Sequence, residues 1–242
     1  MHPSLAEASA VLFDLDGVLT PTAIAHEHAW ERTFVEVLAE LGIDRPYTPA
    51  DYFAQLDGKP RYEGVAAMLA SRDVTLPWGE PSDAPSMLTV CGIGNRKNTA
   101  FAAVLAEEGV TAYPGSVALL DALQAAAIPV AVVSSSRNAR AVLGAAGLLP
   151  RFSVIVDGAY ATEHGLPGKP APDTFLEAAR LLGTEPSRAA VVEDAISGVR
   201  AGAAGGFAPV IGVDRGAGGP ALRAAGADLV VEDLGALAGS AT

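Results

Sequence analysis

The chain has little cysteine, little lysine and no long apolar run, and each shortage excludes a class of protein. Its single cysteine, Cys91, cannot form a disulfide within the chain or build a zinc cluster, so we expect a reducing compartment and no thiolate metal site. Gly, Pro or charged residues break every apolar run well before the roughly 20 residues that a membrane helix needs. The opening MHPSLAEASA lacks the basic stretch and apolar core of a secretion signal. These shortages predict a globular cytoplasmic protein with no membrane partner.

Positive charge is also scarce. The formal net charge is −12, which excludes the broad basic surface that a nucleic-acid partner requires. Among the 16 basic residues only three are lysines, and each stands in a Gly-flanked segment: Lys59, Lys97 and Lys169. We hypothesise that these sites use a compact ammonium in place of a guanidinium fork. A small anionic substrate fits this chain if its few cations gather locally.

What the chain does contain is a series of short apolar runs that predict buried strands. They are continuously apolar, as in strands covered on both faces, and they span residues 10–13, 129–133, 153–156, 189–192, 208–213 and 227–231. Helical segments lie between them, with start and stop signals such as Pro172 and Gly183, over residues 116–127, 138–146 and 172–182. This alternation predicts an α/β fold with a Rossmann-like, doubly wound parallel sheet.

The first strand is separated from the second by a long stretch of different character. Residues 21–41 carry apolar side chains at helical spacing and end at Gly42. A Pro/Gly/Asp loop follows over residues 76–85, and a second helix is predicted over residues 98–108. We therefore expect residues 1–21 and 110–242 to form the α/β core, and residues 22–109 to form a small inserted helical domain.

Polar residues follow the predicted strands at the point where each strand ends. Asp14 and Asp16 follow the first strand, Ser134 follows the second, Lys169 lies in the loop after the third, and Glu193 and Asp194 follow the fourth. The carboxyl ends of parallel strands meet at one edge of the sheet, so these groups should converge. Clustered carboxylates repel one another unless a cation lies among them, and all-oxygen ligands favour Mg²⁺. Magnesium, hydroxyls and a lysine together predict a phosphate site.

These segments resemble the four motifs of the haloacid-dehalogenase-like (HAD) superfamily. The matching segments are DLDGVL, the strand-terminal Ser134, KPAPDTF at Lys169, and VVEDAISG. The resemblance implies that Asp14 is the nucleophile of an aspartyl-phosphate mechanism and that Asp16 is the general acid and base. It also implies that Mg²⁺ is held by Asp14, the Asp16 carbonyl, Glu193 and Asp194, that Ser134, Ser135 and Lys169 bind the reacting phosphate, and that the insertion is a cap.

Within the superfamily the chain is most similar to the β-phosphoglucomutase-like branch. That branch converts β-D-glucose 1-phosphate to D-glucose 6-phosphate through a bound 1,6-bisphosphate, so the resemblance implies a small phosphorylated sugar as substrate. It places substrate-binding residues in the segments TPTAIAHEHAW, LDGKPR, NRKN and SSSRN, namely Thr22, His26, Trp30, Gly58, Arg61, Lys97, Asn98, Ser136, Arg137 and Asn138. We expect a monomer.

Two alternatives remain open at this stage. A sugar-phosphate or phosphoglycolate-like phosphatase would share the fold, metal and nucleophile, and would differ in letting water attack the phosphorylated aspartate. The chain departs from the branch pattern at Pro21, Asp57 and Gly168, and its segment over residues 76–91 is longer. These departures keep the phosphatase alternative open. A phospho-receiver signalling domain also carries a strand-end Asp, an acidic pair, a hydroxyl and a Lys. It does not place a second Asp beside the nucleophile on its first strand.

Overall fold

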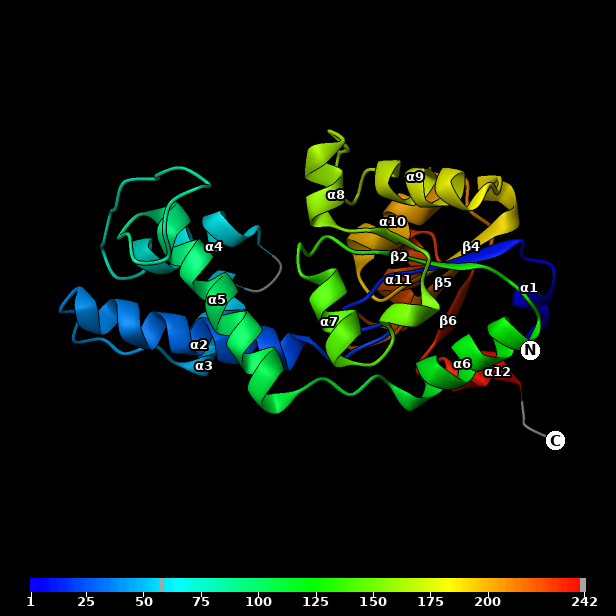
Figure 1. Ribbon diagram of the computed structural model, residues 1–242, viewed down its shortest axis with the longest axis horizontal. Helices are drawn as coiled ribbons and strands as arrows, with labels where there is room; N and C mark the ends of the chain where they lie inside the picture. The colour runs from blue at the N-terminus through cyan, green and yellow to red at the C-terminus, as the bar shows by residue number, and fades with distance from the viewer. Residues whose placement is uncertain (57–58, 240–242) are drawn as a thin grey trace. The chain divides into compact units, whose positions relative to one another are not determined.

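In the computed structural model, which describes residues 1–56 and 59–239, six parallel strands form one sheet in the order β3-β2-β1-β4-β5-β6 (Figure 1). The strands are β1 (Ala10–Phe13), β2 (Val130–Val133), β3 (Val154–Val156), β4 (Ala189–Glu193), β5 (Val210–Val213) and β6 (Leu229–Val231). The strand order reverses between β1 and β4, which is the point where ligands bind in doubly wound sheets. The predicted fold class is confirmed.

The central strand β1 is fully buried and sets the place of the first acidic residue. Phe13, its last residue, pairs with Val132 of β2 on one side and Val192 of β4 on the other. Continuous Val, Leu and Ala side chains fill both faces of this strand, as a parallel sheet requires. The chain therefore leaves the sheet at Asp14, between the ends of its two neighbouring strands.

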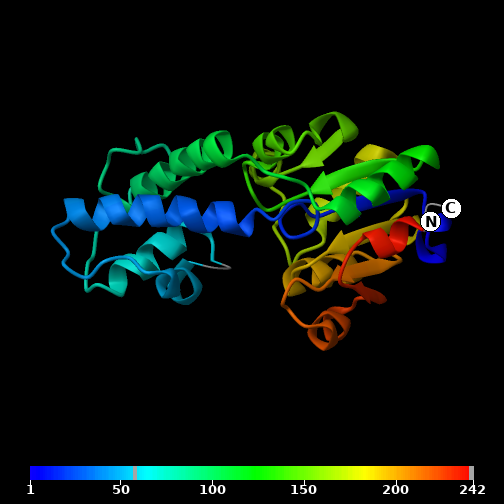
Figure 2. The same cartoon turned by 90° about the horizontal axis from the view of Figure 1, so that it is seen from below.

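Helices cover both faces of the sheet. On one face α9 (Asp173–Leu182), α10 (Ile196–Ala204) and α11 (Gly219–Ala225) pack on an apolar cluster that includes Leu12, Val191 and Phe175. On the other face α6 (Pro114–Ala125) and α12 (Gly235–Ala238) pack against each other (Figure 2). The remaining helices of this unit are α1 (Pro3–Ala6), α7 (Ala139–Ala145) and α8 (Gly158–Glu163), with short 3₁₀ turns over 149–151 and 186–188.

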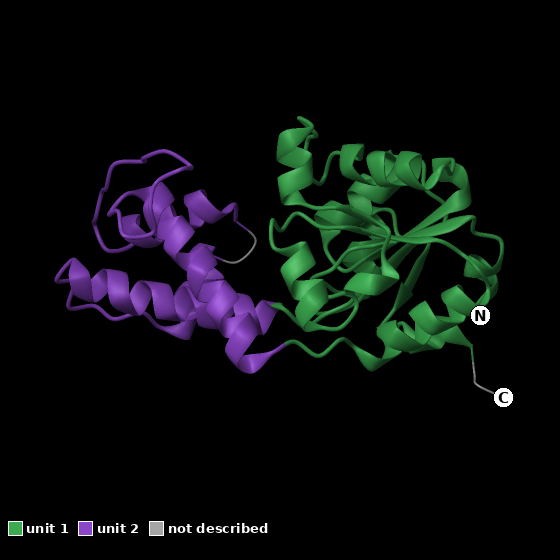
Figure 3. Ribbon diagram, in the orientation of Figure 1, with its two compact units in different colours: residues 1–22, 110–242 green, residues 23–109 purple. Residues whose placement is uncertain are grey.

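The chain divides into two compact units, residues 1–22 with 110–242 and residues 23–109 (Figure 3). The second unit consists of α2 (Ala23–Glu40), α3 (Pro49–Asp51), a π-helical turn (Tyr52–Leu56), α4 (Arg61–Ala70) and α5 (Val90–Glu108). It has an apolar core of its own, in which Trp30, Phe34, Met68 and Ile93 are buried. Among the described residues, none of the helices combines the length and apolarity needed to span a bilayer.

The sequence placed the start of the last helix of unit 2 wrongly. The sequence pattern predicts a helix from residue 98, whereas α5 begins at Val90. The Thr89 side chain accepts a hydrogen bond from the Gly92 backbone N–H and caps the helix. Gly92 and Gly94, which lower helix propensity, are needed here for space. A Cβ at Gly92 would lie 2.4 Å from the Met87 carbonyl oxygen, and one at Gly94 would lie 2.6 Å from the Tyr62 ring.

A buried ion pair stabilises unit 2. The Arg72 guanidinium donates two hydrogen bonds to Asp51, at 2.8 and 2.7 Å, and the Thr48 backbone N–H and hydroxyl also donate to this carboxylate. The hydrogen bonds from Arg72 hold the pKa of Asp51 well below its ordinary value, although burial opposes this. The pair therefore contributes its full stability near neutral pH, and loses it as the pH falls below the ordinary carboxyl range.

We expect Asp51→Asn to lower the free energy of unfolding by about 3 kcal/mol, because the charge of Arg72 would stay buried without its counter-ion. Urea unfolding at neutral pH measures the change, and Asp44→Asn, at an exposed carboxylate in the same unit, is the matched control. Equal midpoints for both variants would contradict a stabilising role for the pair.

Candidate active site

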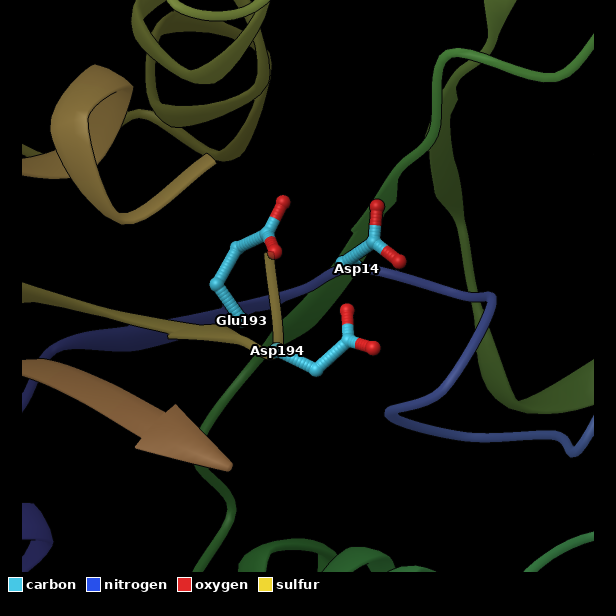
Figure 4. Close-up of side chains that lie close together, drawn as sticks. All are labelled: Asp14, Glu193 and Asp194. Carbon is cyan, nitrogen blue, oxygen red and sulfur yellow. The ribbon is translucent and has the colours of Figure 1, made fainter. Parts of the chain in front are cut away.

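Three carboxylates meet at the ends of β1 and β4. Asp14 is anchored by its backbone N–H, which donates to the Val192 carbonyl at 2.9 Å. Glu193 is the last residue of β4, and Asp194 follows it. One oxygen from each carboxylate lies within 4.8 Å of the others (Figure 4). Asp14 and Glu193 are buried, and Asp194 is half-buried. An all-oxygen group of this size and charge fits a hard divalent cation such as Mg²⁺.

Lys169 is the positive charge among these carboxylates. Its ammonium donates to Asp14 Oδ1 at 2.5 Å, to Glu193 Oε1 at 2.7 Å and to the Val133 carbonyl at 2.9 Å. Burial opposes the charged form of Lys169, but the two carboxylates outweigh it and raise its pKa above the ordinary value. The lysine is therefore an ammonium that links the ends of β1, β2 and β4.

The acidic cluster holds more negative charge than one lysine neutralises. Burial raises the pKa of Asp14 well above its ordinary value, Lys169 offsets part of this rise, and the charge of Glu193 adds to it. Burial, followed by the charge of Glu193, raises the pKa of Asp194 to about 7. A bound divalent cation would stabilise the ionised forms of both groups, which is why the donor set fits a metal.

The turn after β1 holds the second aspartate of the pair. The Gly17 backbone N–H donates to the Thr20 carbonyl at 2.8 Å, and this folds residues 16–20 into a tight turn. The Asp16 side chain accepts a hydrogen bond from the Thr22 hydroxyl. The structure thus brings together two predicted site residues, Asp16 and Thr22, six positions apart in the chain.

The segment after β2 combines a buried serine with exposed neighbours. Ser134 is buried, and its hydroxyl oxygen accepts a hydrogen bond from the Ser136 backbone N–H at 3.0 Å. The Ser136 hydroxyl in turn accepts from the Asn138 N–H at 3.2 Å, just before α7 begins. Ser135 and Arg137 are exposed. Since Lys169 donates to the Val133 carbonyl, Ser134 lies next to the charged cluster, while Ser136 and Asn138 shape the turn into α7.

The predicted residues of unit 2 form a second cluster. The Lys97 ammonium lies 2.6 Å from His26 Nδ1, and the ring of His26 stacks on Phe101. Burial, the charge of Lys97 and that of Arg61 lower the pKa of His26 to about 3, so the imidazole is neutral and accepts this hydrogen bond. The Lys97 ammonium also lies 5.2 Å from the centroid of the Trp30 ring, which is part of the apolar core.

Arg61 and Asn98 complete this cluster. The Arg61 guanidinium donates to the Asn98 side-chain oxygen at 3.2 Å, which joins the start of α4 to α5. Gly58, the remaining substrate-binding prediction, lies outside the described residues. The structure therefore places an acidic group with one lysine and the segment 134–138 in unit 1, and a cationic, aromatic group in unit 2.

Sequence reasoning missed a glycine on which the acidic group depends. The Glu193 side chain is fixed by the Ala195 backbone N–H, which donates to Oε2 at 2.8 Å, and it packs against Gly198 of α10. A Cβ at Gly198 would lie 1.7 Å from Glu193 Oε1. Gly198 is the last residue of the VVEDAISG segment, but the match of that segment assigned it no role.

We expect Gly198→Ala to displace the Glu193 carboxylate, to weaken Mg²⁺ binding at least roughly tenfold, and to cost about 1–3 kcal/mol of stability from overpacking. Calorimetric Mg²⁺ titration and thermal unfolding measure these effects. Gly144→Ala in α7, where no atom lies within 4 Å of the new methyl, is the control and should be neutral or slightly stabilising. Wild-type Mg²⁺ affinity in the Gly198 variant would contradict the assignment.

Comparison with known proteins identifies the family. A family model described as haloacid dehalogenase-like hydrolase matches residues 8–206. A β-phosphoglucomutase of Mycobacterium tuberculosis is 48% identical over 237 residues, which cover 94% of this chain and 90% of that protein. Hexitol phosphatase A of Escherichia coli is 34% identical, and the match covers 92% of this chain and 90% of that protein. The crystal structure of a β-phosphoglucomutase from Clostridium difficile, 26% identical, matches with a TM-score of 0.73 over 95% of this chain and 93% of that chain. The chain therefore belongs to the haloacid dehalogenase-like hydrolase family.

Proposed function

We propose that this protein is a Mg²⁺-dependent phosphotransferase, a β-phosphoglucomutase that interconverts β-D-glucose 1-phosphate and D-glucose 6-phosphate through the 1,6-bisphosphate. The observation that carries the proposal is the acidic cluster in which Asp14 lies against Lys169, Glu193 and Asp194. Its support in the comparisons is the 48% identity to a β-phosphoglucomutase over almost the whole chain. The family assignment removes the phospho-receiver alternative.

In this proposal Asp14 attacks the phosphorus atom of the substrate and carries the phosphoryl group as an aspartyl phosphate. Lys169 keeps its ammonium beside Asp14 and neutralises oxygens of the transferring group, while Ser134 and Ser135 hold the same group. Mg²⁺, held by Asp14, the Asp16 carbonyl, Glu193 and Asp194, would supply charge neutralisation and in-line orientation. Asp16 protonates the departing sugar oxygen and later takes the proton from the attacking hydroxyl.

The cationic group of unit 2 supports a substrate with two phosphates. Arg61 offers a fork suited to a phosphate, and Asn98 already fixes its orientation. Lys97 adds an ammonium that neutral His26 orients through Nδ1, and the Phe101 ring stacks on that imidazole. We assign Arg61, Lys97 and Asn98, with Thr22, His26, Trp30, Gly58, Ser136, Arg137 and Asn138, to the sugar and its distal phosphate.

The test is product analysis by ³¹P NMR. Wild-type protein with Mg²⁺, β-D-glucose 1-phosphate and catalytic β-glucose 1,6-bisphosphate should produce D-glucose 6-phosphate with little inorganic phosphate. The α anomer is the control and should remain unchanged, because the site would accept the phosphate in one orientation at carbon 1. Excess chelator should abolish the conversion.

A phosphatase is the second candidate, favoured by the similarity to Hexitol phosphatase A. Both candidates use the same phosphorylated aspartate, and they differ in whether a sugar hydroxyl or water attacks it. Inorganic phosphate as the main product, with no glucose 6-phosphate, would replace the mutase by the phosphatase. A panel of sugar 1-phosphates and hexitol phosphates would then identify the substrate.

A further inference from the structure

Arg215 connects three segments of unit 1 that meet beside the acidic cluster. It follows β5, outside all the motif segments of the sequence. Its Nε–H donates to the Gly17 carbonyl at 2.9 Å, and Nη1 donates to the Glu232 carbonyl at 3.0 Å. The guanidinium carbon lies 3.9 Å from the centroid of the Tyr113 ring, a stacking distance. Although Arg215 is exposed, these three contacts hold its side chain in one conformation.

The carbonyl that Arg215 holds belongs to the turn between Asp16 and Thr20. Gly17 adopts φ +83°, and a Cβ there would lie 2.0 Å from Asp194 Oδ2. The Gly17 backbone therefore contacts Asp194 directly. Asp16, the residue before Gly17, is the proposed general acid and base. A shift of this peptide would move Asp16 and open space beside Asp194.

The ring on which Arg215 stacks is attached to the same turn. The Tyr113 backbone N–H donates to the Leu19 carbonyl at 3.0 Å, and the Ser116 hydroxyl donates to the Val18 carbonyl at 2.7 Å. Arg215 thus touches the turn directly at Gly17 and indirectly through Tyr113. The side chains of Val18, Leu19 and Thr20 are buried, so the Gly17 peptide, which has no side chain to anchor it, is the part of the turn that Arg215 holds.

We propose that Arg215 is a positioning residue for phosphoryl transfer: it fixes the Gly17 peptide, and through it the placement of Asp16 and Asp194. The catalytic part of this inference rests on the proposed function. Lysine cannot replace Arg215, since a single ammonium lacks the planar surface that stacks on Tyr113 and the fork that reaches both carbonyls.

The experiment compares Arg215→Met, Arg215→Lys and the control Arg223→Met, an exposed arginine on α11. Hydrogen exchange followed by mass spectrometry measures how well the amides of the turn are protected. Steady-state kinetics with β-D-glucose 1-phosphate measure kcat and KM. Both Arg215 variants should expose the amides of residues 17–20 to exchange about tenfold faster than wild type. Their kcat should fall roughly 10-fold to 100-fold, with KM changed less than about twofold. The control should match wild type in both measurements.

Each other result decides against the proposal. Unchanged exchange in Arg215→Met would mean that Arg215 does not hold the turn. Faster exchange with an unchanged kcat would mean that the turn does not need this hold for catalysis. Full activity in Arg215→Lys would show that the positive charge alone is sufficient, and that the guanidinium fork is not needed. If wild-type protein transferred no phosphoryl group, the proposed function would fail, while the exchange data would still decide whether Arg215 fixes the turn.

Discussion

Asp14→Asn should lower the rate of phosphoryl transfer by about 10⁴-fold or more, which is the largest effect on activity expected for any single substitution in this chain. The amide has the same size and still accepts a hydrogen bond from Lys169, so the fold and the lysine contact should survive. What disappears is the nucleophilic oxygen. An amide cannot carry a phosphoryl group from one substrate oxygen to another, and no second carboxylate occupies the position that directly follows β1.

Two measurements separate lost chemistry from lost structure. Rapid-quench trapping with ³²P-labelled bisphosphate should label wild-type protein and leave the Asp14→Asn variant unlabelled, while circular dichroism and melting stay close to wild type. Asp121→Asn, at an exposed carboxylate paired with Arg151, is the matched control and should be labelled normally. Covalent label in the Asp14→Asn variant would place the nucleophile elsewhere and refute the proposed mechanism.

Lys169→Met should have the largest effect on stability, about 3–5 kcal/mol, together with a loss of most activity. The Lys169 side chain is 6% exposed, and its ammonium lies against two buried carboxylates. Methionine fills similar volume but leaves Asp14 and Glu193 without their counter-charge. Lys59→Met, at an exposed lysine of unit 2, is the control and should leave the free energy of unfolding nearly unchanged.

The pH dependence of the Lys169 variant gives a second check. Burial already raises the pKa of Asp14, and removal of Lys169 takes away the contact that opposed this rise. A carboxyl whose pKa is higher in the folded state destabilises the fold most above that pKa, and the penalty shrinks as the pH falls toward the unfolded value. The stability deficit relative to wild type should therefore narrow from neutral pH to mildly acid pH, and added Mg²⁺ should also narrow it. A deficit that widened on acidification would contradict the charge argument.

The strands and their terminal residues were predictable from sequence because burial on both faces leaves a local signature. Five predicted runs contain an observed strand, and the fourth falls one residue short of the end of β4. The ends of β1, β2 and β4 carry Asp14, Ser134 and Glu193, as expected from parallel topology. Spacing along the chain is enough for this step, since parallel strands align their ends. The roles of these residues stay predictions until the experiments above are done.

Two long-range polar contacts outside the predicted acidic group were not predictable. Arg72 and Asp51 stand 21 positions apart, and Arg215 and Gly17 stand 198 positions apart, with no periodicity that links either pair. The start of α5 was missed for a related reason. Gly92 and Gly94 argue against a helix locally, and only the tertiary approach of Met87 and Tyr62 explains them.

The hydrogen bond between Leu19 and Tyr113 has a consequence for protein engineering. It places the entry and exit points of residues 23–109 at neighbouring positions on the α/β unit, although almost ninety residues separate them along the chain. A segment whose two ends lie so near each other can be removed or replaced as one unit. It can be excised with a short glycine linker, or exchanged for the corresponding segment of a relative, without stretching the sheet that carries it.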